Sequence, residues 1–521
     1  MKRLTLIACI LGSGIALLDG TVVNVALPTI QRELGGGLAA QQWVVNGYLL
    51  TLGSLILVGG SLGDLYGERR IFELGVTGFG IASLGCALAP TIGWLVAARA
   101  LQGVTSALLT PASLAVIVNT FPPSERGGAI GAWTAWGTIA AVLGPLLGGE
   151  LLAIASWRWI FVINVPFVLV CLAIIRVAIP RAPARPVGAR RVDVPGALLC
   201  AVGLGGTVFA LIEQPRLGWS SPGVLAPLLG GAALLGAFVF YESRARDPML
   251  PLRLFARRNF SAGNVETFSM YAGLAIVFFF LILFLQQIGG YSPLKSGLTT
   301  LPVTVVMFVL SRRFGALADR FGPRLFMGGG PLVCAAGLLL FQRTGIHVDY
   351  LADVLPPLLL FALGLSLTVA PLTAAVLADA TNDDAGIASG VNNAIARVAG
   401  LMGTAAVGAA VAGSFVADLQ SRLAGVKLDA AARAAVTAAK RLPLGRPDVH
   451  ALPAGQARVL TSAAEQASLH SFHVGMAIAA ALLAVGGLIG AAGIRNQRGV
   501  VPAEECASGQ LLGSGRHTLA G

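Results

Sequence analysis

The chain contains 521 residues, of which 56% are hydrophobic and only 12% are charged, and its mean hydropathy is +0.80. Soluble globular proteins carry about 25% charged residues, so this composition predicts an integral membrane protein. The net charge of +12 would favour a nucleic-acid partner in a soluble protein. Here the arginines cluster in short loops between apolar segments, which argues against a nucleic-acid surface.

The six cysteines are scattered, without Cys-x-x-Cys or Cys/His spacing, so we expect neither a disulfide framework nor a metal site. The sequence has no phosphate-binding loop of the G-x-x-x-x-G-K-S/T type and no HExxH, GxSxG or paired-carboxylate constellation. We therefore expect no cofactor and no enzyme activity. Transport, if present, would depend on an ion gradient.

Apolar segments long enough to cross a hydrocarbon core of about 30 Å recur along the chain and predict about fourteen spans. They lie at about 5–30, 41–63, 70–90, 94–118, 127–152, 158–179, 193–214, 222–242, 260–288, 297–317, 324–342, 354–378, 386–413 and 471–494. The first segment continues past Asp19 without a small-residue cleavage site, so we interpret it as an uncleaved span rather than a signal peptide. An even number of spans puts both termini on one side.

The basic residues predict which side that is. If the N-terminus is cytoplasmic, most arginines fall in cytoplasmic loops, and the short loops on the opposite side hold few. These few are Arg32, Arg158, Arg216, Lys295 and Arg343. The sequence therefore predicts a multi-pass membrane protein with both termini in the cytoplasm. Its Ala-, Gly- and Arg-rich composition hints at a bacterial source, and hence at a bacterial cell (inner) membrane.

The segment 414–470 is predicted to be a long outer loop. It carries several basic residues, but long loops translocate largely regardless of charge. Its AARAAVTAAK stretch predicts a short surface helix, and the rest, rich in Pro and Gly, is predicted to be irregular. The tail 496–521 is predicted to be disordered.

One short pattern occurs twice, each time where an inward-running span ends: GSLGDLYGERR at 60–70 and GALADRFGPR at 315–324. The residues concerned are Gly60, Asp64, Gly67, Arg69 and Arg70 in the first copy and Gly315, Asp319, Gly322 and Arg324 in the second. A helix C-terminus disfavours negative charge, so each Asp needs a basic or N-terminal partner. Such pairs suit a conformational latch. The alternative, charges that only enforce topology, explains the arginines but not the Asp or the glycine spacing.

The two copies lie too far apart for two six-span halves of equal length, so the spans at about 193–242 are interpreted as an inserted pair. The predicted domains are an N-terminal six-helix bundle at 1–180 and a cytoplasmic linker with the inserted pair at 181–258. A C-terminal six-helix bundle at 259–495, including the outer loop, and the tail 496–521 follow.

Two charged residues of the first half lie deep inside predicted spans. Asp19 stands in LDGTVVNVALP of the first span and Arg99 in LVAARALQGVTSA of the fourth. A rise of 1.5 Å per residue places them at a similar depth, and the cost of burying charge makes both functional candidates. A nearby arginine favours the carboxylate while burial disfavours it, a balance that suits reversible protonation. The alternatives are an Asp hydrogen-bonded only for packing and a permanent structural ion pair.

Other polar residues within spans are candidates for a substrate cavity: Asn24, Asn46, Gln102, Glu266, Gln286, Asn392, Asn393 and Arg397. Asn24 suits a helix–helix contact as well as a substrate contact. Glu266 lies shallow in its span and either faces an inward cavity or snorkels to the surface. Asn393 and Arg397, four residues apart, share one helix side.

The fifth span contains GTIAAVLGPLLGGELL. Pro145 removes a backbone hydrogen bond and kinks the helix, while Gly144, Gly148 and Gly149 allow another helix to approach closely. The ordered Gly-Pro-x-x-Gly-Gly string is far more specific than glycine-rich packing alone.

Together these motifs resemble the major facilitator superfamily, and specifically its fourteen-span drug:proton antiporters of the EmrB/QacA type. LDGTVVNVALP resembles that family's first-span motif, GSLGDLYGERR the superfamily loop signature, RALQG the fourth-span motif and GPLLGG the antiporter motif. The segments 157–167 and 285–302 are also similar to family segments. Two features depart from the family: Phe167 stands where Gly is frequent, and the outer loop is unusually long.

The resemblance implies an all-α integral membrane protein with the major facilitator fold, two six-helix bundles plus two inserted helices. It implies that Asp19 and Arg99 take part in proton coupling, that Gly144 and Pro145 shape the antiporter helix and that Asp64 belongs to the latch. The expected function is proton-coupled efflux of amphipathic, cationic or antibiotic-like compounds by alternating access. We expect a monomer, with a periplasmic adaptor if the source is Gram-negative.

Two alternatives stay open from the sequence. One is a proton-linked importer of a small nutrient on the same fold, which Gly144-Pro145 argues against. The other is a membrane receptor or scaffold that signals through its outer loop, in which case buried Asp19 and Arg99 would have no transport role.

Overall fold

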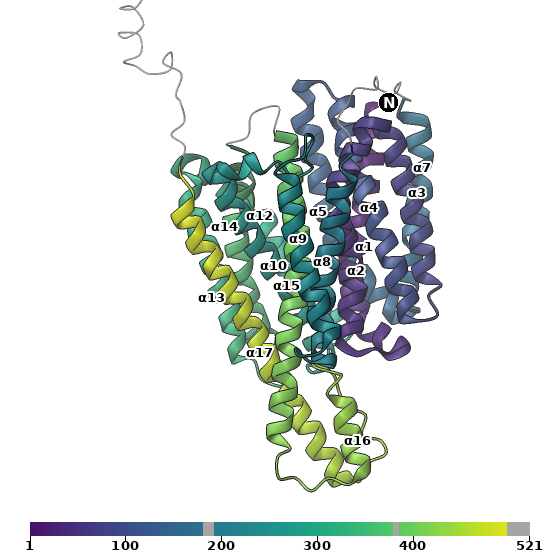
Figure 1. Ribbon diagram of the computed structural model, residues 1–521, viewed down its shortest axis with the longest axis vertical. Coiled ribbons are helices and arrows are strands. Elements are labelled where there is room, and N and C mark those ends of the chain that lie inside the picture. The colour runs from purple at the N-terminus through teal and green to yellow at the C-terminus, as the bar shows by residue number, and fades with distance from the viewer. Residues whose placement is uncertain (181–191, 379–384, 497–521) are drawn as a thin grey trace, which may run out of the picture.

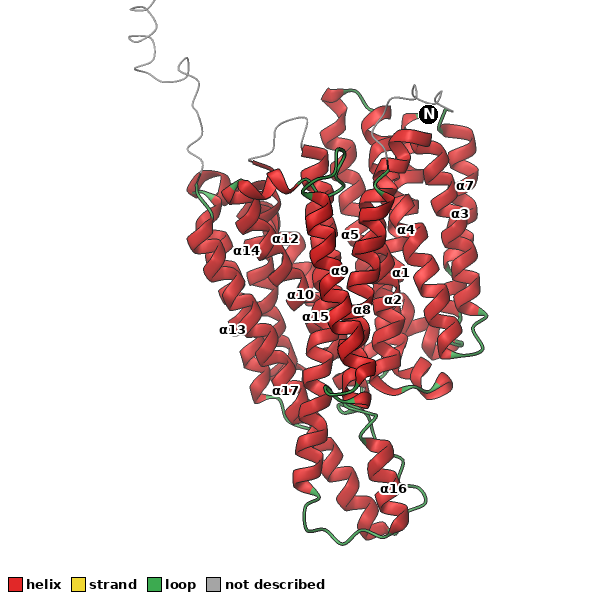
Figure 2. Cartoon of the chain, viewed as in Figure 1, coloured by secondary structure: helices red, strands yellow, loops and turns green. Residues whose placement is uncertain are grey.

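The computed structural model describes residues 1–180, 192–378 and 385–496, and over these ranges the chain is built from helices and connecting loops without strands (Figures 1 and 2). The predicted disordered tail, apart from its first residue, and most of the Arg-rich linker after the sixth span lie outside the described residues.

The helices of the first half are α1 (Lys2–Leu34), α2 (Gly37–Tyr66), α3 (Glu68–Ala87), α4 (Ile92–Thr120), α5 (Pro123–Ile154), α6 (Trp159–Val162) and α7 (Asn164–Ala178). The inserted pair is α8 (Val194–Leu217) and α9 (Pro222–Glu242). The second half contains α10 (Arg258–Gln287), α11 (Pro293–Leu298), α12 (Leu301–Phe321), α13 (Pro323–Leu340), α14 (Leu355–Ala378), α15 (Ala385–Arg422), α16 (Ala430–Ala439) and α17 (Ala454–Gly493).

Among the described residues, thirteen helical segments are long and apolar enough to cross a membrane. The remaining predicted span, 70–90, is α3, whose first turns carry Glu68, Arg69, Arg70 and Glu73. These charges lower its hydropathy, but α3 packs along α4 and α7 and runs the same course through the molecule (Figure 1). With α3, the described helices make up the predicted set of about fourteen.

The helix packing of the first half is repeated in the second. In the first, α1 packs on α5 and α7, α2 on α4, and α3 on α4 and α7. In the second, α10 packs on α15 and α17, α12 on α14, and α13 on α14 and α17. The pair α8–α9 is packed together, and α8 lies against α2 and α15. The predicted architecture of two six-helix bundles with an inserted pair is confirmed.

The N-terminus and the end of α17 lie at one end of the bundle, which we call the inner end (Figure 1). At the opposite, outer end, α15 and α17 project beyond the other helices and pack with α16; residues 414–470 form this outer subdomain. The predicted surface helix is confirmed as α16. The prediction that the rest is irregular is wrong for residues 414–422 and 454–470, where both long helices continue outward, and correct for the segments between the helices.

The outer subdomain has a small hydrophobic core of its own. Phe415 and Leu419 lie on one face of α15, and Leu423, the first residue after the helix, extends this face at the same four-residue spacing. This face packs on Leu460 and Ala464 of α17. Apolar burial along a single helix face explains why the segment is helical, because it stabilises helix that propensity alone would leave marginal.

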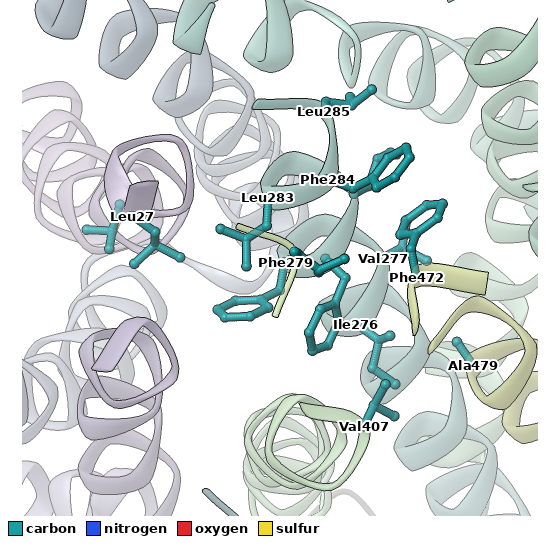
Figure 3. Packing of buried hydrophobic residues seen from close by; sticks show 14 of the residues in the cluster. Leu27, Ile276, Val277, Phe279, Leu283, Phe284, Leu285, Val407, Phe472 and Ala479 are labelled. Carbon is teal, nitrogen blue, oxygen red and sulfur yellow. The ribbon is translucent and has the colours of Figure 1, made fainter. Parts of the chain in front are cut away.

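A larger core joins the two halves on the outer side of the bundle. Leu27 of α1 lies opposite Phe279 and Leu283 of α10 (Figure 3). Behind them, the rings of Phe284 and Phe472 are stacked with centroids 4.2 Å apart. This apolar contact closes the outer half of the space between the bundles.

Candidate functional site

Polar contacts reinforce the closure of the outer side. Gln286 Nε2 donates to Val25 O at 2.9 Å. Gln42 Nε2 donates to Thr404 O at 2.6 Å, and Thr404 Oγ1 donates to Asn46 Oδ1 at 2.9 Å. Gln286 and Asn46 were predicted to line a substrate cavity. The structure instead places both in contacts between the halves.

A cavity of about 610 Å³ lies at the inner end. The inner parts of α2, α4, α5 and α15 form its wall together with residues beside α8 and α9. Of the predicted cavity residues in the described chain, Asn393 is the one that lines it. The wall includes the polar and aromatic residues Asn393, Trp133, Asp64, Glu68, Asp193 and Asp247. The described wall contains no Lys, Arg or His. The space between the two halves is closed at the outer end and open at the inner end, so the molecule is inward-facing.

The two predicted charged residues meet in the first half. Arg99 Nη1 donates to Asp19 Oδ2, and the two side chains are 1% and 0% exposed. Arg99 Nη1 also donates to Gln102 Oε1 at 2.8 Å, and Gln102 Nε2 donates to Ser83 Oγ at 2.7 Å. Asn164 Nδ2 donates to Asp19 Oδ1 at 3.0 Å. Donors from α4 and α7 thus satisfy the buried carboxylate, which such a charge requires. Gln102, predicted for the cavity, belongs to this network.

Sequence reasoning missed Ser83, Asn164 and Tyr48 as members of the network. The Arg99 guanidinium lies over the Tyr48 ring, 4.5 Å from its centroid, a favourable cation–π contact. Arg397 of α15 reaches α2 from the second half, where its Cβ would lie 3.3 Å from a Cβ at Gly53. Asn164 is a polar residue in an apolar span, so the cost of burial that identified Asp19 could also have identified Asn164.

The antiporter helix α5 packs closely on α1. A Cβ at Gly144 or Gly148 would collide with Thr21 or its neighbour on α1. Because Pro145 has no N–H, the carbonyl of Ala141 loses its helical partner. Thr21 Oγ1 donates to Ala141 O at 2.9 Å and replaces that partner. The part of α5 around Pro145 is therefore hydrogen-bonded to the same helix that carries Asp19.

The other side of α5 contacts α11 of the second half. A Cβ at Gly149 would collide with Leu294, and a Cβ at Gly297 would lie 2.5 Å from Pro145 O. The Gly-Pro-x-x-Gly-Gly string thus connects α1 on one side with the outer closure on the other.

Three predicted cavity residues lie elsewhere. Glu266 was expected at an inward cavity or at the surface, and the structure shows neither: it is fully buried beside Gly490, and neither carboxyl oxygen has a partner among the described residues. Asn392 Nδ2 donates to Thr267 Oγ1 at 2.8 Å within the second half. The Oδ1 of Asn24 is buried, again without a described partner. The environment of each of these residues depends on which side of its helix it lies. The sequence of an apolar span does not reveal that side.

The repeated loop motif has the same backbone in both copies. Gly67 and Gly322 end α2 and α12 with φ of 91° and 85°. This left-handed region favours glycine, which explains the residue. Gly60 and Gly315 face α4 and α14, and a Cβ added at each would lie 3.8 and 3.6 Å from its nearest neighbour. These are ordinary contact distances, so close approach does not explain the two glycines.

The motif arginines occupy equivalent places in the two halves. Arg69 donates to Ile179 O at the end of α7, and Arg324 Nε donates to Ala491 O near the end of α17 at 2.6 Å. Each arginine therefore binds the C-terminal end of the last helix of its own half, where positive charge is favourable. Arg70 is exposed.

Asp64 lines the inner cavity, and the Asp319 side chain lies outside those that the structure describes. The latch role of both residues stays a prediction. Among the described side chains, no group of three or more His, Cys, Asp and Glu is placed to hold a metal ion.

Comparison with known proteins agrees with this architecture. The model of the Major Facilitator Superfamily matches residues 9–404. The puromycin resistance protein pur8 of Streptomyces alboniger is 39% identical over 78% of this chain and 81% of its own length. The tetracenomycin C resistance and export protein of Streptomyces glaucescens is 34% identical over 78% and 76%. The multidrug resistance protein Stp of Mycobacterium tuberculosis is 34% identical over 81% and 78%.

Solved structures share the fold. A bacterial homologue of the human lysosomal transporter Spinster, inward-facing and unoccupied, matches with a TM-score of 0.65 at 18% identity, over 95% of this chain and 99% of that one. The peptide transporter POT in complex with sulfate matches with a TM-score of 0.58 at 14% identity, over 77% and 88%. The family model, the relatives and the repeated six-helix packing together show that the chain belongs to the major facilitator superfamily.

Proposed function

We propose that this protein is a drug:proton antiporter that exports amphipathic, cationic or antibiotic-like compounds by alternating access. The observation that carries the proposal is the buried Asp19–Arg99 pair. Asp19 lies on α1, and Thr21 of the same helix is hydrogen-bonded to the antiporter helix α5 near Pro145. The names of its relatives, which include resistance and export proteins, support the same reading. The acidic wall of the inner cavity favours positively charged substrates.

The Asp19 network suggests how a proton acts. Arginine stays protonated in proteins, so Asp19 is the member of the pair that exchanges a proton. Protonation removes the charge that Arg99 faces and weakens the bonds that Asp19 accepts from Arg99 and Asn164. Because α1 is bonded to α5 through Thr21, a shift of α1 reaches the α5–α11 contact of the outer closure. The protonation state of Asp19 and the outer closure are thereby coupled.

Proton flux measured in vesicles against a panel of compounds tests the proposal. In the wild type, adding an exported compound should drive proton movement in the opposite direction. Asp19→Asn should stay in the membrane and lose proton-driven export, since the amide cannot exchange a proton. Undiminished export by well-expressed Asp19→Asn would rule out the coupling role. Proton movement in the same direction as the compound would instead identify a proton-linked importer.

We also propose the arrangement of the whole chain in the membrane. Residues 1–180 and 259–495 form the two moving bundles, 181–258 carries the inserted pair, and 496–521 is a tail. The basic residues support a cytoplasmic inner end in a bacterial inner membrane. The transporter works as a monomer, with an adaptor if it sits beneath an outer membrane, and it moves its substrate without covalent chemistry.

A further inference from the structure

Two acidic side chains of the inserted pair meet at the inner end. Asp193 caps α8, and its Oδ1 accepts a hydrogen bond from Gly196 N at 2.9 Å. Glu242 ends α9, and its Oε2 accepts from Leu250 N at 3.0 Å. The two residues are only 8% and 2% exposed. Each carboxyl group therefore has one oxygen bound by a backbone amide and little contact with bulk water.

The remaining oxygens, Asp193 Oδ2 and Glu242 Oε1, are buried and have no hydrogen-bond partner among the described residues. They converge on one small space, because a Cβ at Gly196 would collide with both. Among the described residues, Cys200 and Tyr241 lie beside the pair, and neither side chain brings positive charge. Two buried carboxylates that face each other cannot both ionise without strong repulsion.

We propose that Asp193 and Glu242 share one proton and form a proton-binding site in the wall of the inner cavity. The shared proton bridges the two unpartnered oxygens. Asp193 lines the cavity together with Asp64, Glu68 and Asp247, so the site is next to the space that a substrate enters. A cation in the cavity favours loss of this proton, because the pair then carries a second negative charge.

The site gives the inserted helices a function in transport. The α8–α9 pair lies against α2 of the first half and α15 of the second and supplies part of the cavity wall. If the shared proton is exchanged for a cationic substrate, binding of the substrate at the inner end depends on pH. This pH dependence is separate from the one that Asp19 causes. This consequence for transport rests on the proposed export function, whereas proton binding by the pair does not.

Infrared spectroscopy of the purified full-length protein, titrated from about pH 5 to pH 9, detects protonated carboxyl groups directly. Glu242→Gln should remove the signal of one protonated carboxyl. Asp193→Asn should remove the same signal, and it keeps a side-chain acceptor at the N-cap of α8. Glu213→Gln is the matched control, since Glu213 lies near the outer end of α8 in an ion pair with Arg216 at 2.9 Å. An unchanged signal in both variants of the pair would overturn the proposal.

Gly196→Ala provides a second test that removes neither carboxyl group. Its methyl group forces the two oxygens apart, so the signal of the shared proton should disappear at lower pH than in the wild type. If the signal persists to the same pH, the two oxygens do not share a proton.

Ethidium uptake into inverted vesicles separates the two proposals. Glu242→Gln should shift the pH dependence of uptake, and Asp19→Asn should abolish proton-driven uptake at every pH. A wild type that moves no compound of the panel would contradict the proposed export function, and the infrared titration would still decide the proton site. An unshifted pH profile together with an unchanged infrared signal would remove both the site and its role.

Discussion

Pro145 cannot donate a backbone hydrogen bond to the Ala141 carbonyl of α5, and the hydroxyl of Thr21 donates to that carbonyl instead. A single hydroxyl group is thus responsible for one contact between α1 and α5 close to Asp19. Thr21→Val keeps the shape of the side chain and leaves the Ala141 carbonyl unpaired in an apolar setting. We expect a destabilisation of about 1–3 kcal/mol, the cost of an unsatisfied buried polar group. It should appear as a lower apparent melting temperature of the purified protein.

Two controls attribute this loss to the carbonyl. Thr21→Ser retains the hydroxyl and should be close to wild type. Pro145→Ala restores the N–H that pairs with Ala141 O inside the helix. In the Pro145→Ala background, Thr21→Val should therefore cost much less than in the wild type. An equal cost in the two backgrounds would contradict the assignment, because additive effects are the mark of independent sites.

At the level of helices, the motif arginines stabilise the ends of α7 and α17. Arg69→Ala removes the donor to Ile179 O, and Arg324→Ala removes the donor to Ala491 O. A charge at a helix C-terminus contributes about 1 kcal/mol, so amide exchange in the last turn should become about fivefold faster. Hydrogen exchange should show this at α7 for the first variant and at α17 for the second.

The neighbouring Arg70→Ala is the control for a general loss of charge, because Arg70 is exposed. It should leave exchange at both helix ends unchanged. Faster exchange spread over the whole bundle in Arg69→Ala would point to a folding defect instead of a local cap.

The sequence predicted the helices well because about 20 apolar residues in succession have few other stable forms in a membrane. It also placed Asp19 and Arg99 at a similar depth and identified both from the cost of burying charge, which is compatible with the pair in the structure but did not predict their contact. Gln286, Asn46 and Glu266 were misplaced for a common reason. In a helix that is apolar on all sides, hydropathy does not show which side faces a cavity, a partner helix or the lipid.

Segments with mixed composition were harder to predict for a different reason. The outer subdomain was expected to be mostly irregular because its Pro and Gly residues suggest loops. Those residues lie between the helices, while Phe415 and Leu419 continue the periodic apolar face of α15. The contribution of α8 and α9 to the inner cavity depends on contacts between distant segments, which a single sequence does not contain.

On the scale of the whole molecule, the inward-facing state depends on contacts between the halves on the outer side. Leu27 packs against Phe279 and Leu283, and α11 fits against α5 where Gly297 meets Pro145 O. At the inner end the cavity lies between parts of the same two halves, which still touch where Leu57 of α2 meets Gly390 of α15. Weakening the outer contact should therefore favour the opposite state without altering the cavity itself.

Gly297→Leu places a side chain where the structure has room for none, so we expect it to open the outer side. Gln42→Cys serves as reporter, because Gln42 is 2% exposed and bonded to Thr404 in the closed state. A shift of about 1.4 kcal/mol towards the open state raises its accessible fraction about tenfold. The rate of labelling by a water-soluble maleimide should rise accordingly, measured against the same protein without the reporter.

Gly93→Leu is the matched control, since a Cβ at Gly93, at the start of α4, meets no atom within 4 Å. It should leave the labelling rate of the reporter unchanged. If Gly297→Leu labels no faster than the control although it folds and inserts, the α5–α11 contact does not hold the outer side closed. The closure would then depend on the apolar core around Leu27, and Leu27→Ala should produce the acceleration that Gly297→Leu lacks.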